Sequence, residues 1–204
     1  MKVRIVVMAA LALALSGLAA RAADPRYPNW PCTQAKVPDI SLAAVWAGPA
    51  LDDAETKWKD DAKVTALVSK LSARKTPMDE AETSVKEFLA GSASEKAANA
   101  KLLFAGLFDT LNAQRSQVMN GLERVSRKQR EAADKIREET IQLQALQGAT
   151  PHDDTKLEAL SNELIWKTRI FEDRNKVVRF VCEVPTAIDQ RLFALGRVIQ
   201  QEME

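Results

Sequence analysis

Apolar residues alternate at spacings of four and three along two long stretches of the chain, 93–147 and 151–203. In the first stretch, ten of the thirteen positions in this seam are apolar: Phe104, Phe108, Leu111, Arg115, Val118, Leu122, Val125, Gln129, Ala132, Ile136, Glu139, Leu143 and Leu146. The seam of the second stretch consists of Leu157, Leu160, Leu164, Lys167, Phe171, Arg174, Val178, Val181, Ile188, Leu192, Leu195 and Ile199. Alternation sustained over this many heptads is typical of a coiled coil, so we predict two long helices that pair along these seams.

The short connector at Gly148 requires the two helices to run antiparallel. This topology places Val118 near Cys182 and Phe104 near Leu195. Pro185 interrupts the second helix, but the seam resumes in phase at Ile188, which favours one bent helix over two independent ones.

The polar seam residues Arg115, Gln129 and Glu139 leave a second arrangement open, in which the heptads pair between two chains. The sequence is therefore compatible with a monomer or a homodimer.

Two shorter helices are predicted over residues 52–73 and 77–90. A hydroxyl followed three residues later by an acid marks the start of a helix at Thr76, Ser92 and Thr150. A second apolar face of the long helix, formed by Leu102, Leu103 and Leu107, marks the open end of the hairpin as the place where the shorter helices pack.

Residues 23–50 differ from the rest of the chain because they hold five prolines, which exclude a long helix. Tyr27, Trp30 and Trp46 are interleaved with these prolines and favour burial over disorder. We predict an extended N-terminal arm with a short helix near 41–47. The expected fold is all-α: a long antiparallel hairpin, two shorter helices at its open end, and this Pro-rich arm, with 51–204 as a single helical domain.

Residues 1–22 are typical of a cleaved secretory signal. Lys2 and Arg4 precede an uncharged apolar run from Ile5 to Ala20, which is short for a spanning helix, and small residues flank Arg21 at the expected cleavage site. We expect a periplasmic protein with no transmembrane segment after cleavage; the alternative is an uncleaved anchor.

Cys32 and Cys182 are the only cysteines, and they lie 150 residues apart. In an oxidising compartment a disulfide between them is the simplest prediction, and it would pin the N-terminal arm to the hairpin. The alternative is two separate thiols. No Cys-x-x-Cys motif indicates a redox or haem site.

Charge excludes one class of function. The first 22 residues hold three bases and no acid, so the remaining chain has 26 bases against 28 acids and a net charge near −2. Nucleic-acid binding depends on neutralising phosphates, so we do not expect it here.

Basic residues nevertheless cluster in the middle of the hairpin, at 124–137 and 167–179. This segregation indicates either a solvated surface or a site that attracts an anionic partner. The candidate residues are Arg124, Arg127, Lys128, Arg130, Arg169 and Arg174.

An apolar stripe outside the seam contains Trp166, Ile170, Val177 and Val184. One interpretation is that the N-terminal arm covers this stripe near Cys182. The other is that Trp166 and Ile170 are exposed anchors for a partner.

Catalytic and metal-binding patterns are weak. His152 lies beside Asp153 and Asp154 at the predicted turn, without a third or fourth ligand. The acid pairs 52–53 and 60–61 point about 100° apart on a helix, so they do not converge as a catalytic dyad does. No cofactor motif occurs.

The sequence thus favours a periplasmic, non-enzymatic interaction protein that docks another envelope protein through its hairpin. The alternative is a protein that binds an anionic envelope surface, lipid headgroup or glycan, through the basic midsection. An enzyme or metal-binding module is the third possibility.

Overall fold

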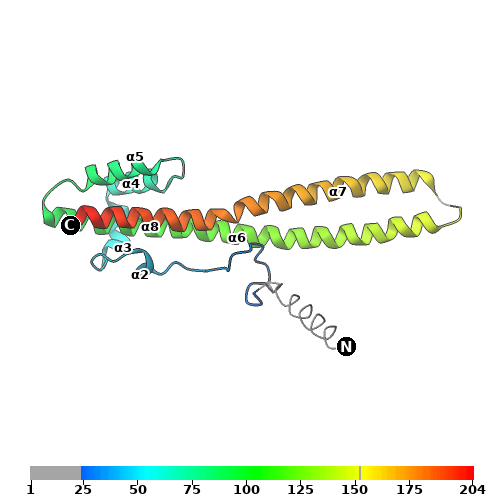
Figure 1. The fold of residues 1–204 in the computed structure, drawn as a ribbon, viewed down its shortest axis with the longest axis horizontal. Helices are drawn as coiled ribbons and strands as arrows, with labels where there is room; N and C mark the ends of the chain where they lie inside the picture. Colours follow the sequence, from blue (N-terminus) through cyan, green and yellow to red (C-terminus); the bar gives the residue numbers. More distant parts are fainter. Residues whose placement is uncertain (1–23, 152) are drawn as a thin grey trace, which may run out of the picture.

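The computed structural model describes residues 24–151 and 153–204, which form helices and loops without a strand. Three long helices dominate: α6 (Ala93–Gly148), α7 (Asp154–Val181) and α8 (Glu183–Met203). Figure 1 shows α6 lying beside α7 and α8, which run in the opposite direction. The prediction of an all-α fold is confirmed, and the long α6 fits the predicted hairpin. Supercoiling of the two halves stays a prediction, and the predicted signal and His152 lie outside the described residues.

Polar residues fix how the two halves of the hairpin align. Each of the three polar residues predicted in the first seam meets a polar side chain of the opposite half within the same chain. These pairs are Arg115 Nε with Asp189 Oδ1 at 2.7 Å, Gln129 Nε2 with Asn175 Oδ1 at 2.9 Å, and Glu139 Oε1 with Lys167 Nζ at 2.5 Å. Because buried polar groups need specific partners, these contacts define one antiparallel register.

Two predicted seam positions are wrong. Arg174 is exposed, and Asn175 faces Gln129 in its place. Val125 is also exposed, although it was assigned to the seam of α6. The contact positions on α7 thus follow the spacing four, four, three at this point, because a straight helix with 3.6 residues per turn drifts out of a strict seven-residue repeat.

The second half of the hairpin changes direction between α7 and α8. Only Cys182 separates the two helices, and its backbone is helical, with φ −59° and ψ −25°. Pro185 has no N–H, so the helical hydrogen bond that this residue would donate to the carbonyl of Val181 is missing. The α8 helix then continues with Ile188, Leu192, Leu195 and Ile199 buried against α6.

Shorter helices cover the open end of the hairpin. They are α3 (Ala54–Lys57), the 3₁₀ turn η1 (Trp58–Asp60), α4 (Ala62–Ser72) and α5 (Met78–Phe88). In Figure 1, α4 and α5 lie over the C-terminal part of α8. The α4 and α6 helices approach closely at Gly106, where a Cβ atom would lie 2.7 Å from Val68 Cγ2.

Hydrogen bonds of short polar side chains explain where the observed helices differ from the predicted ones. The expected helix 52–73 is interrupted at Asp61, whose carboxylate accepts the backbone N–H of Lys63 at 2.8 Å and starts α4. Thr76 does not cap α5; its hydroxyl donates to the carbonyl of Lys70 at 2.8 Å and closes the preceding loop. Asp153 caps α7, so this helix begins at residue 154 and not at 151.

The start of α6 agrees with the prediction. The carboxylate of Glu95 accepts the backbone N–H of Ser92 at 3.0 Å. Hydrogen bonds from Ser92 hold the pKa of Glu95 below its usual value, because they favour the ionised carboxylate.

The N-terminal arm contains one short helix, α2 (Leu42–Val45), inside the predicted span 41–47. Trp46 is buried after it and stacks on Phe104, with ring centroids 4.3 Å apart. The backbone passes so close to α8 that a Cβ at Gly196 would lie 2.6 Å from the carbonyl oxygen of Val45. No helix in the described part of the chain is long and apolar enough to span a membrane.

Candidate docking groove on the helical hairpin

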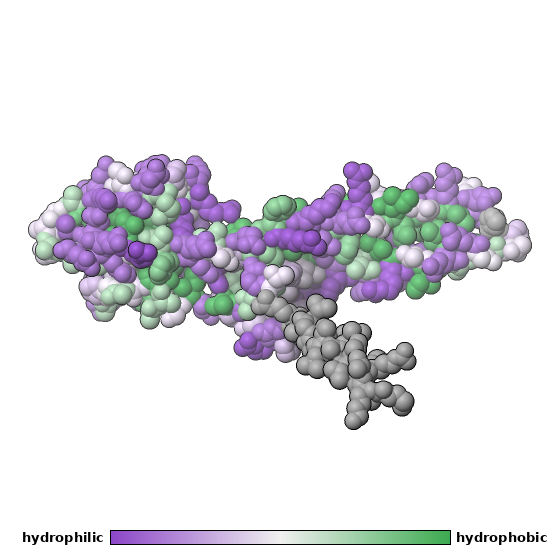
Figure 2. Space-filling view, viewed as in Figure 1, coloured by the Kyte–Doolittle hydropathy of each residue, from purple (hydrophilic) through white to green (hydrophobic). Residues whose placement is uncertain are grey.

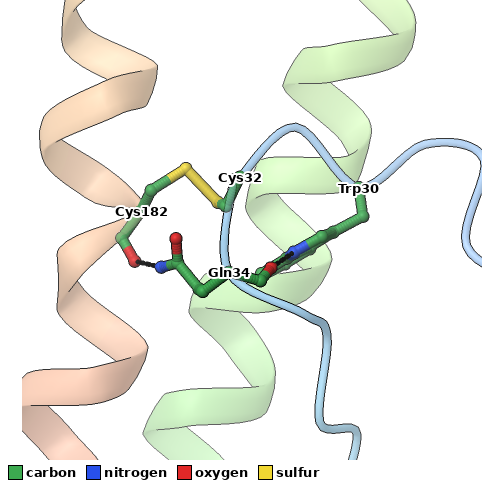
Figure 3. Close-up of a disulfide and its surroundings, with 4 residues drawn as sticks. All are labelled: Trp30, Cys32, Gln34 and Cys182. Atoms are coloured by element: carbon green, nitrogen blue, oxygen red, sulfur yellow. Dashed lines mark hydrogen bonds between the residues drawn. A yellow bond between two sulfur atoms is a disulfide. The ribbon is translucent and has the colours of Figure 1, made fainter. Parts of the chain in front are cut away.

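The disulfide fixes the N-terminal arm to the middle of the hairpin, as Figure 3 shows. Cys32 and Cys182 are joined, with their Cα atoms 5.5 Å apart. Gln34 Nε2 donates to the carbonyl of Cys182, and Trp30 Nε1 donates to the carbonyl of Gln34 at 2.7 Å. The disulfide and these hydrogen bonds place the arm on the side of the hairpin that carries Cys182.

Ionic and hydrogen-bonding contacts extend this attachment along α6. They are Lys36 Nζ to Glu123 Oε1 at 2.7 Å, Arg115 Nη1 to the carbonyl of Pro38 at 3.0 Å, and Arg130 Nη1 to the carbonyl of Pro28 at 2.6 Å. Figure 1 shows the arm following α6 over this distance. One face of the hairpin is therefore occupied by the protein's own N-terminal segment.

The opposite face is open. Helical residues are about 100° apart, so on α6 Gly121 and Val125 lie about 160° from Glu123, which contacts the arm. On this open face, an apolar groove of about 570 Å³ runs between α6 and α7. The groove is lined by Val118, Gly121, Leu122, Arg124, Val125, Lys128, Arg174, Val177, Val178 and Val181. We call it the basic groove, because every charged residue in its lining is a cation.

The basic groove continues toward the hairpin tip. A second hollow of about 230 Å³ shares Arg174 with it and is lined by Ala132, Lys135, Ile136, Lys167, Ile170 and Phe171. None of the side chains of α7 is fully buried, although this helix has 28 residues. The packing of α7 against α6 alone leaves much of its apolar surface accessible.

Large apolar side chains protrude from α7, and one of them, Val177, also lines the groove. Trp166 is 61% exposed, Val177 is 60% exposed and Phe180 is 78% exposed. Figure 2 shows apolar surface between charged residues along this part of the hairpin. These residues form an accessible stripe on α7, which the sequence had indicated without Phe180.

The prediction that the N-terminal arm covers this stripe is wrong. Val184 alone among the four predicted residues packs against the core. The reason is helical geometry: Cys182, which binds the arm, and Val184, which continues the stripe, are two residues apart and so point about 200° apart. The disulfide therefore draws the arm to the other side of the helix.

The structure separates the predicted basic residues into three groups. Arg124, Lys128 and Arg174 line the basic groove. Arg130 binds the N-terminal arm, and Arg127 and Arg169 are exposed but line neither hollow. Within residues 24–151 and 153–204, the three groove cations form no ion pair.

Sequence reasoning misassigned one groove residue and missed one exposed residue of the stripe on α7. Val125 was placed in the seam, and Phe180 was not considered. Phe180 follows Val177 by three positions, which puts both on neighbouring parts of one helical face, so this spacing could have identified it.

A separate hollow of about 520 Å³ lies between the arm and α8, beside the ion pair of Arg115 and Asp189. Val37 and Phe193 are exposed at its edge. Burial raises the pKa of Asp189, and the attraction of Arg115 offsets only part of this rise. These two charged groups already bind each other and the arm, so their arrangement is structural.

Acidic residues proposed in pairs have separate roles. Asp61 caps α4, and Asp52 pairs with Lys101 at 3.0 Å. Within the part of the chain that the structure describes, no three His, Cys, Asp or Glu side chains are grouped as a metal ion would require.

Comparisons with protein-family models, curated proteins and solved structures find no match to this chain. The surface of the hairpin itself is therefore the guide to function.

Proposed function

We propose that this protein is a periplasmic, non-enzymatic interaction protein whose coiled-coil hairpin docks another protein of the cell envelope. The observation that carries this proposal is the unequal use of the two faces of the hairpin. The N-terminal arm and its disulfide occupy one face, whereas the other exposes an apolar groove with three cations that form no ion pair within the described residues. Contiguous exposed apolar surface edged by charged residues is typical of interaction sites.

The extended shape supports this proposal. The open end has a core built from α4, α5, α6 and α8, which holds most of the buried apolar residues. The α6–α7 part contributes few buried residues, so its length adds accessible surface more than stability. A projecting helical pair of this kind is suited to presenting a binding surface at a distance from the core.

Binding to an anionic envelope surface is the second candidate. The basic midsection favours it, because clusters of four to eight basic residues are typical of proteins that bind anionic lipids. Arg130 is engaged by the arm, however, and Lys167, in the hollow toward the tip, pairs with Glu139 and Glu163. The groove is apolar along its length, which a protein partner uses better than headgroups or glycans do.

Site-specific photocrosslinking tests the proposal. A photoreactive residue at Val177, in the groove, is compared with one at Ile141, which has the same exposed fraction of 60%. On α6, Ile141 lies about 160° from the groove residue Val125, so it points away from the groove. We expect the Val177 position to yield an adduct with one exported protein and the Ile141 position to yield none.

The identified protein is then purified and its affinity measured. It should bind the wild-type chain and the variant Ile141→Asp equally, and it should lose affinity for Val177→Asp. Equal loss in both variants, or no loss in either, would contradict a docking site in the groove.

A further inference from the structure

The shape and charge of the basic groove define the kind of partner that fits. We infer that the partner presents an acidic amphipathic α-helix, which lies in the groove as a third helix against α6 and α7. This inference rests on the proposed function and specifies the partner's chemistry. An amphipathic helix in an apolar groove is a recurring mode of recognition, in which residues on one face of the helix serve as anchors.

The groove has the length of a helix of several turns. Its lining extends along α6 from Val118 to Ile136, including the hollow toward the tip. At 1.5 Å per residue this stretch is about 27 Å long, which matches a helix of about 18 residues lying along the groove. A single inserted side chain or a short loop would leave most of this surface uncovered.

The floor of the groove is open at Gly121. A Cβ added there would have only Arg124 Nη2 within 4 Å, at 3.9 Å, so no neighbouring apolar group fills this position. The absence of a side chain lets a third helix approach the backbone of α6, and the valines of α7 form the facing wall.

The charges beside the groove determine which residues should border the apolar face of the partner helix. Arg124 and Lys128 border the groove on α6, and Arg174 borders it on α7. A helix in the groove would therefore meet cations on both sides of its apolar face. Acidic residues at these flanking positions would pair with them, as charged residues beside an apolar seam do in coiled coils.

The same charges argue against two other occupants. A second copy that docked groove to groove would bring its own Arg124, Lys128 and Arg174 close to the same residues of the first copy. The repulsion between these like charges disfavours that contact. A lipid surface is wide and flat, whereas the groove is narrow and is walled by two helices.

Two designed peptides test the inference on the full mature chain. Both are about 18 residues long and share one apolar stripe of leucine and isoleucine; one carries glutamate at the flanking positions and the other carries lysine. Binding is measured by fluorescence anisotropy at low and high salt. We expect the glutamate peptide to bind at least about tenfold more tightly at low salt, and this preference to shrink at high salt.

A charge-reversed variant provides the sharper result. The triple substitution Arg124→Glu, Lys128→Glu and Arg174→Glu should transfer the preference to the lysine peptide. Val177→Asp should weaken both peptides, and the matched control Ile141→Asp should weaken neither. Circular dichroism of each variant checks that the helices are intact.

Three results would overturn the inference. They are equal binding of the two peptides, a preference that survives charge reversal, or groove-dependent binding to phosphatidylglycerol vesicles with no peptide binding. A dimer that dissociates on charge reversal or on Val177→Asp would also overturn it, in favour of a second copy. If photocrosslinking from Val177 still identifies one partner while the peptides show no charge preference, the proposed function stands and only the acidic helix is refuted.

Discussion

Removing the carboxylate of Asp189 should destabilise the fold more than removing its cationic partner. The side chain of Arg115 is only 4% exposed, whereas that of Asp189 is 39% exposed. Asp189→Ala leaves the guanidinium buried with one remaining partner, the carbonyl of Pro38. Breaking a buried ion pair in this way costs about 3 kcal/mol of unfolding free energy.

Arg115→Met has a smaller expected cost. The carboxylate that remains is partly hydrated, and the methionine fills much of the space of the arginine stem. The main loss is the hydrogen bond to Pro38, so we expect a destabilisation of about 1–2 kcal/mol. The double variant Arg115→Met/Asp189→Leu should lie within about 1 kcal/mol of the wild type, because apolar replacement of both partners removes both desolvation costs.

The pH dependence has a definite sign. Burial raises the pKa of Asp189 in the folded protein, and Arg115 opposes this rise. In Arg115→Met the opposition is gone, so the folded pKa of this carboxyl should rise further above its unfolded value. A carboxyl whose folded pKa is raised contributes to the stability of the fold at pH values below its unfolded pKa. This contribution is lost as the pH rises through the folded pKa. The cost of Arg115→Met should therefore shrink as the pH falls toward about 4.

Urea unfolding followed by far-UV circular dichroism, with the disulfide kept intact, measures these differences. The slope of the unfolding free energy against urea should stay constant across the variants. Equal costs for the two single variants, or a larger cost for Arg115→Met, would refute the reasoning that the buried cation is the expensive partner.

Three further predictions concern the core and the arm. Leu122→Asp, at a buried seam position, should cost at least about 4 kcal/mol in urea unfolding, whereas Val177→Asp, on the open face, should change stability by under about 0.5 kcal/mol. Gly196→Ala should destabilise by about 1–3 kcal/mol because its Cβ meets the carbonyl of Val45, whereas the control Gly121→Ala should stabilise α6 by up to about 1 kcal/mol. Cys32→Ser/Cys182→Ser should lower the unfolding free energy by up to about 5 kcal/mol, and thiol labelling of unfolded, non-reduced wild type should modify no cysteine; two labelled thiols would contradict the disulfide.

Local chemistry was enough to predict the long helices. The predicted helix 93–147 ends within one residue of α6, because Ser92 with Glu95 marks its start and Gly148 lies where the periodic pattern ends. The antiparallel pairing also followed from the sequence, since the connector is too short for any other direction. These features depend on neighbours close in the chain.

The shorter elements were less predictable. Asp61 and Asp153 became helix caps, and Thr76 turned its hydroxyl toward Lys70. Short polar side chains can bond to several nearby backbone groups with similar energy, so sequence alone does not decide which bond forms.

The sequence by itself determined the candidate residues of the docking surface: the basic midsection and the apolar stripe with Trp166. The sequence also contains the angle of about 200° between Cys182 and Val184 on the helix. That angle would have excluded the arm from the stripe. Only the tertiary structure decided that Arg130 serves the arm while Arg124, Lys128 and Arg174 border the open groove. The physical reason is that residues 24–40 have no helical periodicity to fix their path. Their position depends on hydrogen bonds to side chains and backbone atoms more than a hundred residues away, such as those from Arg130 to Pro28 and from Gln34 to Cys182. Such pairings become definite only when the helices have packed.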